Sequence, residues 1–223
     1  MLNPVICQIE DEQSSIASQL ENVEHAEGIF IYGECNAKGT WLRSTFASLE
    51  SIGQFELSGI NVEDVSWLQG MKVIGSLVFS YSSGFTNFSG AEELREVQFL
   101  DLYGTDVTTF AGLSGLEKIH EGFNVGYASG LVNLDGLDSL RLVGGIHIYN
   151  SQSLENIKGL SNVASVDTIE ITGNPVLTTL DGCEKMTVTG EAHECQPDEH
   201  LCAARVERVW RVQCRDRIAS QAC

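Results

Sequence analysis

A pair of apolar residues separated by one position recurs along most of this chain at an interval of 22 or 23 residues. The pairs are Phe55/Leu57, Leu77/Phe79, Leu100/Leu102, Phe123/Val125, Ile146/Ile148 and Ile169/Ile171. An earlier pair, Ile29/Ile31, fits after a longer step of 26 residues. A fixed period of this size is the signature of a repeat architecture, in which each unit buries its apolar face against its neighbours.

Two further ladders of apolar residues keep the same phase. One runs three residues ahead of the pairs and consists of Ile52, Ile74, Val97, Ile119, Val143 and Val166. The other consists of Phe88, Phe110, Leu134, Ile157 and Leu180, each followed two residues later by a glycine (Gly90, Gly112, Gly136, Gly159 and Gly182). Three ladders in phase indicate one strand and one tight, glycine-containing turn in every repeat.

The period also decides the fold class. A repeat of about 23 residues leaves room for a strand of about three to five residues but not for a strand and an ordinary crossover helix. Strands stacked roughly 4.8 Å apart pair in parallel and join their apolar faces into one core. We therefore predict an all-β-dominated chain with a single parallel β-solenoid of seven coils over residues 20–190. Residues 1–19 would form an N-terminal cap, and residues 191–223 a Cys- and Arg-rich C-terminal cap that is partly helical and covers the last coil with Trp210.

Residues 136–182, "GLDSLRLVGGIHIYNSQSLENIKGLSNVASVDTIEITGNPVLTTLDG", carry a family resemblance. They are similar to the receptor L domains of insulin- and EGF-type receptors and to the leucine-rich solenoids of bacterial and fungal surface proteins. The likeness covers about residues 20–185. Gly53 and Gly75 keep the family's glycine before the strand, whereas the coils at Val97 and Val166 lack it, and the middle coils replace the family's Asn with Ser or Gly. It implies a non-enzymatic extracellular recognition module without naming a ligand.

The cysteines gather near the two ends of the chain. Cys7 and Cys35 flank the first coil, and the resemblance implies a disulfide there; Cys183, Cys195, Cys202, Cys214 and Cys223 lie in the last 41 residues. We expect a disulfide framework with one cysteine left unpaired, because seven is odd. Two alternatives stay open: free thiols, or a zinc site among His193, Cys195, His200 and Cys202, whose spacing matches no zinc motif.

Composition excludes several partners. A net charge of −18 over 223 residues opposes binding to nucleic acid and to anionic membranes. No apolar run is long enough to span a bilayer, and the first residues lack the basic and apolar segments of an intact leader. We expect an extracellular or cell-surface protein whose leader is not in this chain. No cofactor or metal is expected; Asp135, Asp138 and Asp181 are more typical of turns than of a calcium site.

Side chains alternate along a strand, so the residues between the apolar positions face outward. Among them we select Phe99, Asp101, Tyr103, Asn124, His147, Tyr149 and Glu170 as the candidate binding surface, because aromatic residues are the usual anchors of interfaces. Gly122 and Gly126 predict a shallow trough, roughly 10 Å wide, between the rings of Tyr103 and Tyr149.

Catalysis is not expected from these residues. Asp101 and Glu170 lie three rungs apart, roughly 14 Å, beyond the separation of a glycosidase pair. His147 and Glu170 are neighbours without a clear nucleophile. The sequence therefore favours a module that binds a protein or a glycan through its exposed sheet. The alternatives are a structural or adhesive solenoid without a discrete ligand and, with less support, a polysaccharide-degrading β-helix enzyme.

Overall fold

The computed structural model describes residues 5–6, 23–32, 36–37, 46–62 and 64–189. Seven long strands carry the repeat: β2 (His25–Tyr32), β4 (Ser51–Ser58), β6 (Val73–Ser80), β7 (Glu96–Tyr103), β8 (Lys118–Gly126), β9 (Leu142–Tyr149) and β10 (Ser165–Thr172). Four short strands and two 3-10 helices complete the described chain: β1 (Val5–Ile6), β3 (Asn36–Ala37), β5 (Asn61–Val62), β11 (Thr187–Val188), η1 (Ser66–Leu68) and η2 (Lys158–Leu160).

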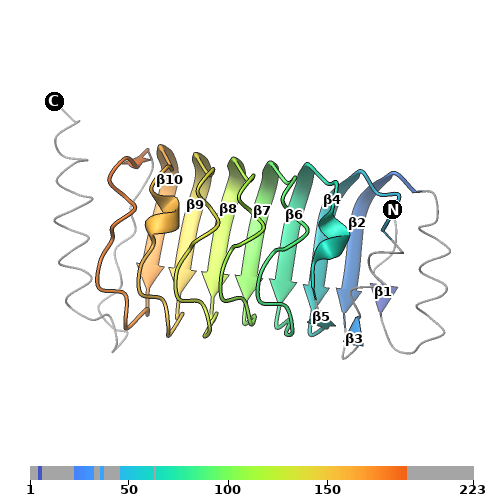
Figure 1. Cartoon of the computed structure of the whole chain (residues 1–223), viewed down its shortest axis with the longest axis horizontal. Coiled ribbons are helices and arrows are strands. Elements are labelled where there is room, and N and C mark those ends of the chain that lie inside the picture. The colour runs from blue at the N-terminus through green and yellow to red at the C-terminus, as the bar shows by residue number, and fades with distance from the viewer. Residues whose placement is uncertain (1–4, 7–22, 33–35, 38–45, 63, 190–223) are drawn as a thin grey trace.

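The long strands form one continuous parallel sheet, as the period predicts. Its order is β1-β2-β4-β6-β7-β8-β9-β10-β11, so each coil adds one strand beside the preceding coil's strand (Figure 1). The register follows the pairs of apolar residues: Phe55 lies beside Leu77, Leu77 beside Leu100, and Leu100 beside Phe123. The prediction of a parallel β-solenoid with coils of about 23 residues is confirmed.

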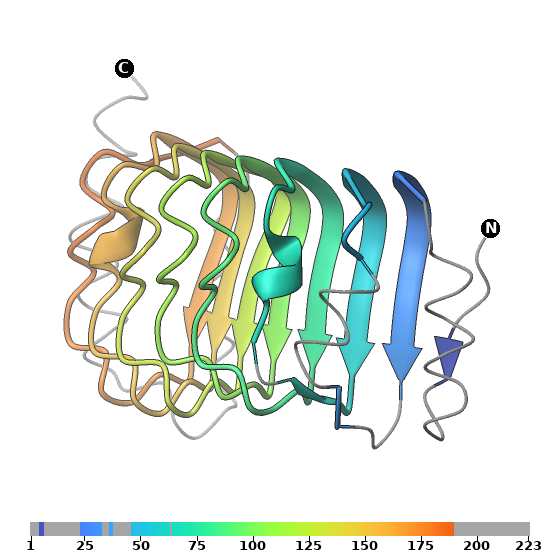
Figure 2. The same cartoon turned by 45° about the vertical axis from the view of Figure 1, so that its right-hand side comes forward.

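The core lies between the inner face of the sheet and the loops that connect successive strands across that face (Figure 2). All three ladders are buried there except at Ile171, which is partly buried; Phe88, Phe110 and Leu134 of the loop ladder are fully enclosed. Phenylalanine rings fill much of the middle: Phe88 stacks on Phe110 of the next coil with ring centroids 5.8 Å apart, and Phe110 contacts Phe123 edge-to-face at 5.5 Å. Such contacts stabilise the stack beyond simple burial.

The prediction of strands of three to five residues is wrong, since six of the seven long strands have eight residues and β8 has nine. The ladder that begins with Ile52 belongs to the same strand as the pairs. Ile52 and Phe55 are both buried although three residues apart, because the strand bends between them and the pairing skips Gly53. A side chain at Gly53 would run into the carbonyl oxygen of Glu27 in the preceding coil. The bend therefore explains the glycine that precedes the pair in several coils.

Strand β8 carries one extra residue at this bend. Val97 pairs with Ile119, but Phe99 pairs with Gly122, so β8 has a β-bulge at His120 and Glu121. The second ladder accordingly runs four residues ahead of the pair in this coil, not three, since Ile119 precedes Phe123. Bulges re-aim side chains, and this one brings His120 to the neighbouring strand.

The loop glycines sit where adjacent coils touch. Gly112 has a φ of 101°, and a Cβ added there would run into the carbonyl oxygen of Phe88 in the preceding coil. Both the backbone conformation and the close approach require glycine. The prediction that these glycines make tight turns is confirmed at this position.

The predicted C-terminal cap at 191–223, with Trp210, lies outside the described residues. Of the predicted N-terminal cap at 1–19, only Val5 and Ile6 are described, and they pair in parallel with Ile31 and Tyr32 of β2. No helix among the described residues has the length and apolar character needed to cross a membrane.

Candidate functional site

Four tyrosines gather on the outer face of the sheet where strands β6 to β9 end. Tyr103 lies in the middle: its ring centroid is 5.0 Å from that of Tyr81, 5.2 Å from that of Tyr127 and 6.3 Å from that of Tyr149. Tyr127 and Tyr149 also contact each other, edge-to-face at 5.9 Å. We call these four residues the tyrosine cluster.

Backbone conformation explains how four rings from four coils meet. Tyr103 and Tyr149 are the last residues of β7 and β9 and stand in one lateral row, with Gly126 of β8 between them. Tyr81 and Tyr127 come one residue after their strands and have φ values of 51° and 55°. This left-handed conformation brings their rings over the same end of the sheet.

The left-handed position recurs in the other coils, where it is occupied mostly by glycine. The equivalent residues are Gly59, Gly104, Asn150 and Gly173, all with positive φ. A non-glycine residue there costs of order 1 kcal/mol. Tyr81 and Tyr127 hold this position while 64% and 48% exposed, so burial of apolar surface offsets little of that cost.

The predicted trough between Tyr103 and Tyr149 is closed, and this expectation is wrong. A Cβ at Gly126 would run into the ring of Tyr149, which means that the ring lies over that glycine. The ring of Phe99 covers Gly122 in the same way. The two glycines make room for aromatic rings, and the tyrosine cluster is a continuous group of rings.

Asp101 supplies a carboxylate on the same face. It lies two residues before Tyr103 on β7, and its Oδ2 accepts a hydrogen bond of 3.3 Å from the side-chain amide of Asn124 on β8. Burial raises the pKa of the Asp101 carboxyl, and the nearby charge of Glu56 raises it further, although the bond from Asn124 acts in the opposite direction. The structure thus holds a half-buried acidic group at the edge of the tyrosine cluster.

The hydroxyl groups of Tyr103 and Tyr149 resist ionisation. A hydrogen bond with the Tyr81 side chain, followed by burial and the neighbouring tyrosines, raises the pKa of Tyr103 to about 12. Burial raises the pKa of Tyr149, and the charge of Asp101 adds to this effect. At neutral pH the hydroxyl groups of Tyr103 and Tyr149 therefore stay protonated, with the Asp101 carboxyl group beside them.

The remaining predicted binding residues lie on the same face but outside the ring contacts. Phe99 stands one outward position before Asp101 on β7. His147 lies beside Asn124 on one side and Glu170 on the other, in the register that the sequence predicts. Glu170 is exposed on β10. Of the predicted residues, Tyr103 and Tyr149 belong to the tyrosine cluster, and Asp101 lies two residues before Tyr103 and bonds Asn124.

The predicted binding residues were selected because they lie next to the apolar pairs within a strand. Tyr81 and Tyr127 each come one residue after a strand ends, so that criterion did not select them. A signal for them exists in the sequence: Tyr81, Tyr103, Tyr127 and Tyr149 follow one another at intervals of 22, 24 and 22 residues. The intervals match the coil length, so each coil from β6 to β9 contributes one tyrosine to the same end of the sheet.

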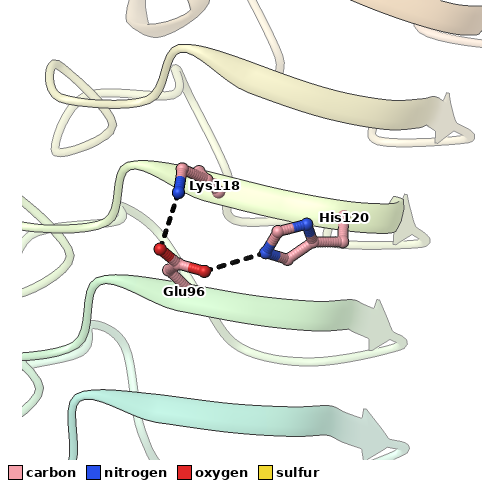
Figure 3. Close-up of polar contacts among 3 residues, drawn as sticks. All are labelled: Glu96, Lys118 and His120. Carbon is pink, nitrogen blue, oxygen red and sulfur yellow. Dashed lines mark hydrogen bonds and ion pairs between the residues drawn. The ribbon is translucent and has the colours of Figure 1, made fainter.

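A second polar group lies at the opposite end of the strands. Glu96 of β7 contacts both Lys118 and His120 of β8, with Oε1 to Nζ at 2.7 Å and Oε2 to Nε2 at 3.0 Å (Figure 3). The hydrogen bonds from Lys118 and His120 lower the pKa of Glu96. These side chains are about one-third exposed or more, and the group has the character of a surface ion pair between neighbouring strands.

In the described part of the chain, no set of three or more His, Cys, Asp and Glu side chains is placed to hold a metal ion. Cys183 is buried. The other six cysteines and the zinc alternative at His193, Cys195, His200 and Cys202 lie outside the described residues.

Comparison with protein-family models, with curated proteins and with solved structures finds no match to this chain.

Proposed function

We propose that this protein is a non-enzymatic recognition module of the cell surface or the extracellular space, which binds a protein or glycan through the outer face of its sheet. The tyrosine cluster carries the proposal. Four tyrosine rings from four successive coils are grouped there, and two of them remain exposed at a backbone position that other coils give mostly to glycine. Backbone strain concentrates at functional sites, and tyrosine is a frequent anchor of interfaces.

The resemblance to receptor L domains supports the same proposal. The coil length, the parallel sheet and the exposed outer face agree with a solenoid that presents a recognition surface. The extracellular location rests on that resemblance and on cysteines concentrated towards the ends of the chain.

The proposal is tested with a double variant, Tyr81→Gly with Tyr127→Gly. Glycine suits the φ values of these positions, so we expect the free energy of unfolding to stay within about 1 kcal/mol of the parent value. The backbone bonds from these residues to the carbonyls of Tyr103 and Tyr149 do not depend on the side chains.

Wild type and variant would be applied side by side to a glycan array and to a peptide-display library. We expect ligands that bind the wild type and bind the folded double variant at least about tenfold more weakly. Once one ligand is identified, Tyr149→Ala should reduce the affinity for that ligand by about fivefold or more. Absence of any ligand, or equal binding by the double variant, would leave the structural solenoid as the better description.

A further inference from the structure

The outward positions around the tyrosine cluster carry acidic side chains and one histidine, His147, but neither lysine nor arginine. In the second half of the described long strands, the charged outward residues are Glu56, Asp101 and Glu170, and neither lysine nor arginine occupies an outward position there. Lys118 and His120 of β8 lie towards the other end of the strand, and both are paired with Glu96. The whole chain is also negatively charged, with a net charge of −18.

Aromatic rings beside a carboxylate favour a particular kind of ligand. A guanidinium group stacks on tyrosine faces and at the same time pairs with a carboxylate, whereas an ammonium group stacks less well. Here the exposed rings are those of Tyr81 and Tyr127, and the carboxylate is that of Asp101. Asp101 lies one outward position before Tyr103 on β7. The ring of Tyr103 contacts both exposed rings, with centroids 5.0 Å from Tyr81 and 5.2 Å from Tyr127, so the carboxyl group and the rings border the same surface.

We propose that the tyrosine cluster and Asp101 form a docking site for a basic segment of a partner protein, with an arginine side chain stacked on the rings and paired with Asp101. This inference rests on the proposed function and names its ligand class. A neutral glycan would also stack on tyrosine rings, but it would leave a half-buried carboxylate without a counter-charge, whereas a guanidinium supplies one. An acidic or phosphorylated partner would meet repulsion.

The test measures binding of three fluorescent peptides of equal length, oligoarginine, oligolysine and oligocitrulline, by fluorescence anisotropy at physiological salt. We expect the wild type to bind oligoarginine several-fold more tightly than oligolysine, and oligocitrulline not at all. The Tyr81→Gly and Tyr127→Gly double variant, which keeps every charge, should lose about tenfold in affinity for oligoarginine. The matched Tyr81→Phe and Tyr127→Phe variant keeps both rings and should retain most of that affinity.

The charge is tested separately. Asp101→Asn should weaken the binding of oligoarginine by about threefold to tenfold. The control is the Asp135→Asn and Asp138→Asn double variant, which removes two charges from the loop between β8 and β9 and should change the affinity by less than twofold.

Two results would overturn the inference. Equal binding of oligoarginine and oligolysine, unchanged in the glycine variant, would show attraction by net charge alone. A glycan that needs Tyr81 and Tyr127 while no basic peptide does would also refute it and would leave the proposed function intact. If the tyrosine variants affect no ligand of either class, both proposals fail.

Discussion

Tyr81 and Tyr127 occupy a backbone conformation that glycine holds in three of the other coils. The strain and the exposure of their rings both work against stability, so packing does not account for their presence. The rings of Tyr81 and Tyr103, from adjacent coils, contact each other edge-to-face with centroids 5.0 Å apart. At the residue scale, the molecule thus presents a surface arranged before any ligand arrives, which reduces the ordering cost of binding.

The raised pKa of Tyr103 gives a prediction at high pH. An unfolded tyrosine ionises near pH 10, whereas folded Tyr103 ionises at about 12. Between these values the folded chain keeps a proton that the unfolded chain has lost, so the free energy of unfolding should fall as the pH rises through this window. Below about pH 10 the contribution of Tyr103 is fully present.

Tyr81→Phe removes the hydroxyl that bonds Tyr103 and keeps the ring. We expect the pKa of Tyr103 to move down towards about 10 and the loss of stability above pH 10 to become less steep. Phenolate absorbance follows the ionisation of the chain's five tyrosines as the pH rises. The Tyr103→Phe variant should lack the step at the highest pH, which assigns that step to Tyr103. Ionisation of all five near pH 10 in the wild type would contradict the hydrogen bond.

Sequence alternation predicted the outward positions of Asp101, Tyr103, Asn124 and Tyr149, because one strand period decides which side chains face solvent. It did not predict that the ring of Tyr149 lies over Gly126, since that depends on rotamers and on the next coil. Nor did it place Tyr81 and Tyr127, whose orientation depends on a positive φ that is unusual for tyrosine.

Within each coil, the strand and the loop meet different demands. The bend at the second ladder lets residues three apart share the core, and the turn glycines let successive loops approach closely. The extra residue in β8 was readable in principle, because Ile119 stands four residues before Phe123 where the other coils have three. Its consequence, the contact of His120 with Glu96, needed the spatial register of β7 and β8.

The turn glycines give a prediction with an internal control. Gly70 and Gly112 both have positive φ, 89° and 101°, but an added Cβ at Gly70 meets no atom within 4 Å, whereas at Gly112 it meets the backbone of Phe88 and Ser89. Gly70→Ala should therefore cost only the conformational term, about 1 kcal/mol. Gly112→Ala should cost about 1 to 3 kcal/mol more, because two stacked coils must separate.

Chemical denaturation of the two alanine variants measures both costs. The difference between them isolates the close approach of neighbouring coils from the preference for positive φ. Equal destabilisation would mean that the loops of successive coils have room to shift, and that the glycine ladder reflects turn conformation alone.

For the molecule as a whole, the period determines nearly everything that the described part shows. Each coil contacts only its neighbours. Aligning the ladder residues in the sequence therefore predicts which residues pair in the sheet, as Phe55, Leu77 and Leu100 do. The ends of the chain do not repeat, and periodicity gives no comparable constraint on them. The long body and the end segment also differ in charge: residues 1–190 carry 8 Lys and Arg against 25 Asp and Glu, and residues 191–223 carry 5 Arg against 6 acids.

The proposed extracellular location makes a prediction about the seven cysteines. Disulfides persist in oxidising compartments and are rare in reducing ones, so an exported protein should carry its end cysteines in bridges. An odd number leaves at least one thiol unpaired. We therefore expect protein purified from its natural source, blocked against exchange and unfolded without reductant, to give one free thiol, or at most three.

The measurement is a thiol titration of the unfolded chain, with the fully reduced protein as the control that must give all seven. Mapping the alkylated peptides then shows whether Cys7 and Cys35 form the bridge that the resemblance to receptor L domains implies, and whether 183–223 contains at least one bridge. Cys183 is buried in the folded chain. The titration is done on the unfolded chain so that the reagent reaches this residue as well. Seven free thiols in the unreduced chain would place the protein in a reducing compartment and remove the support that the cysteines give to an extracellular role.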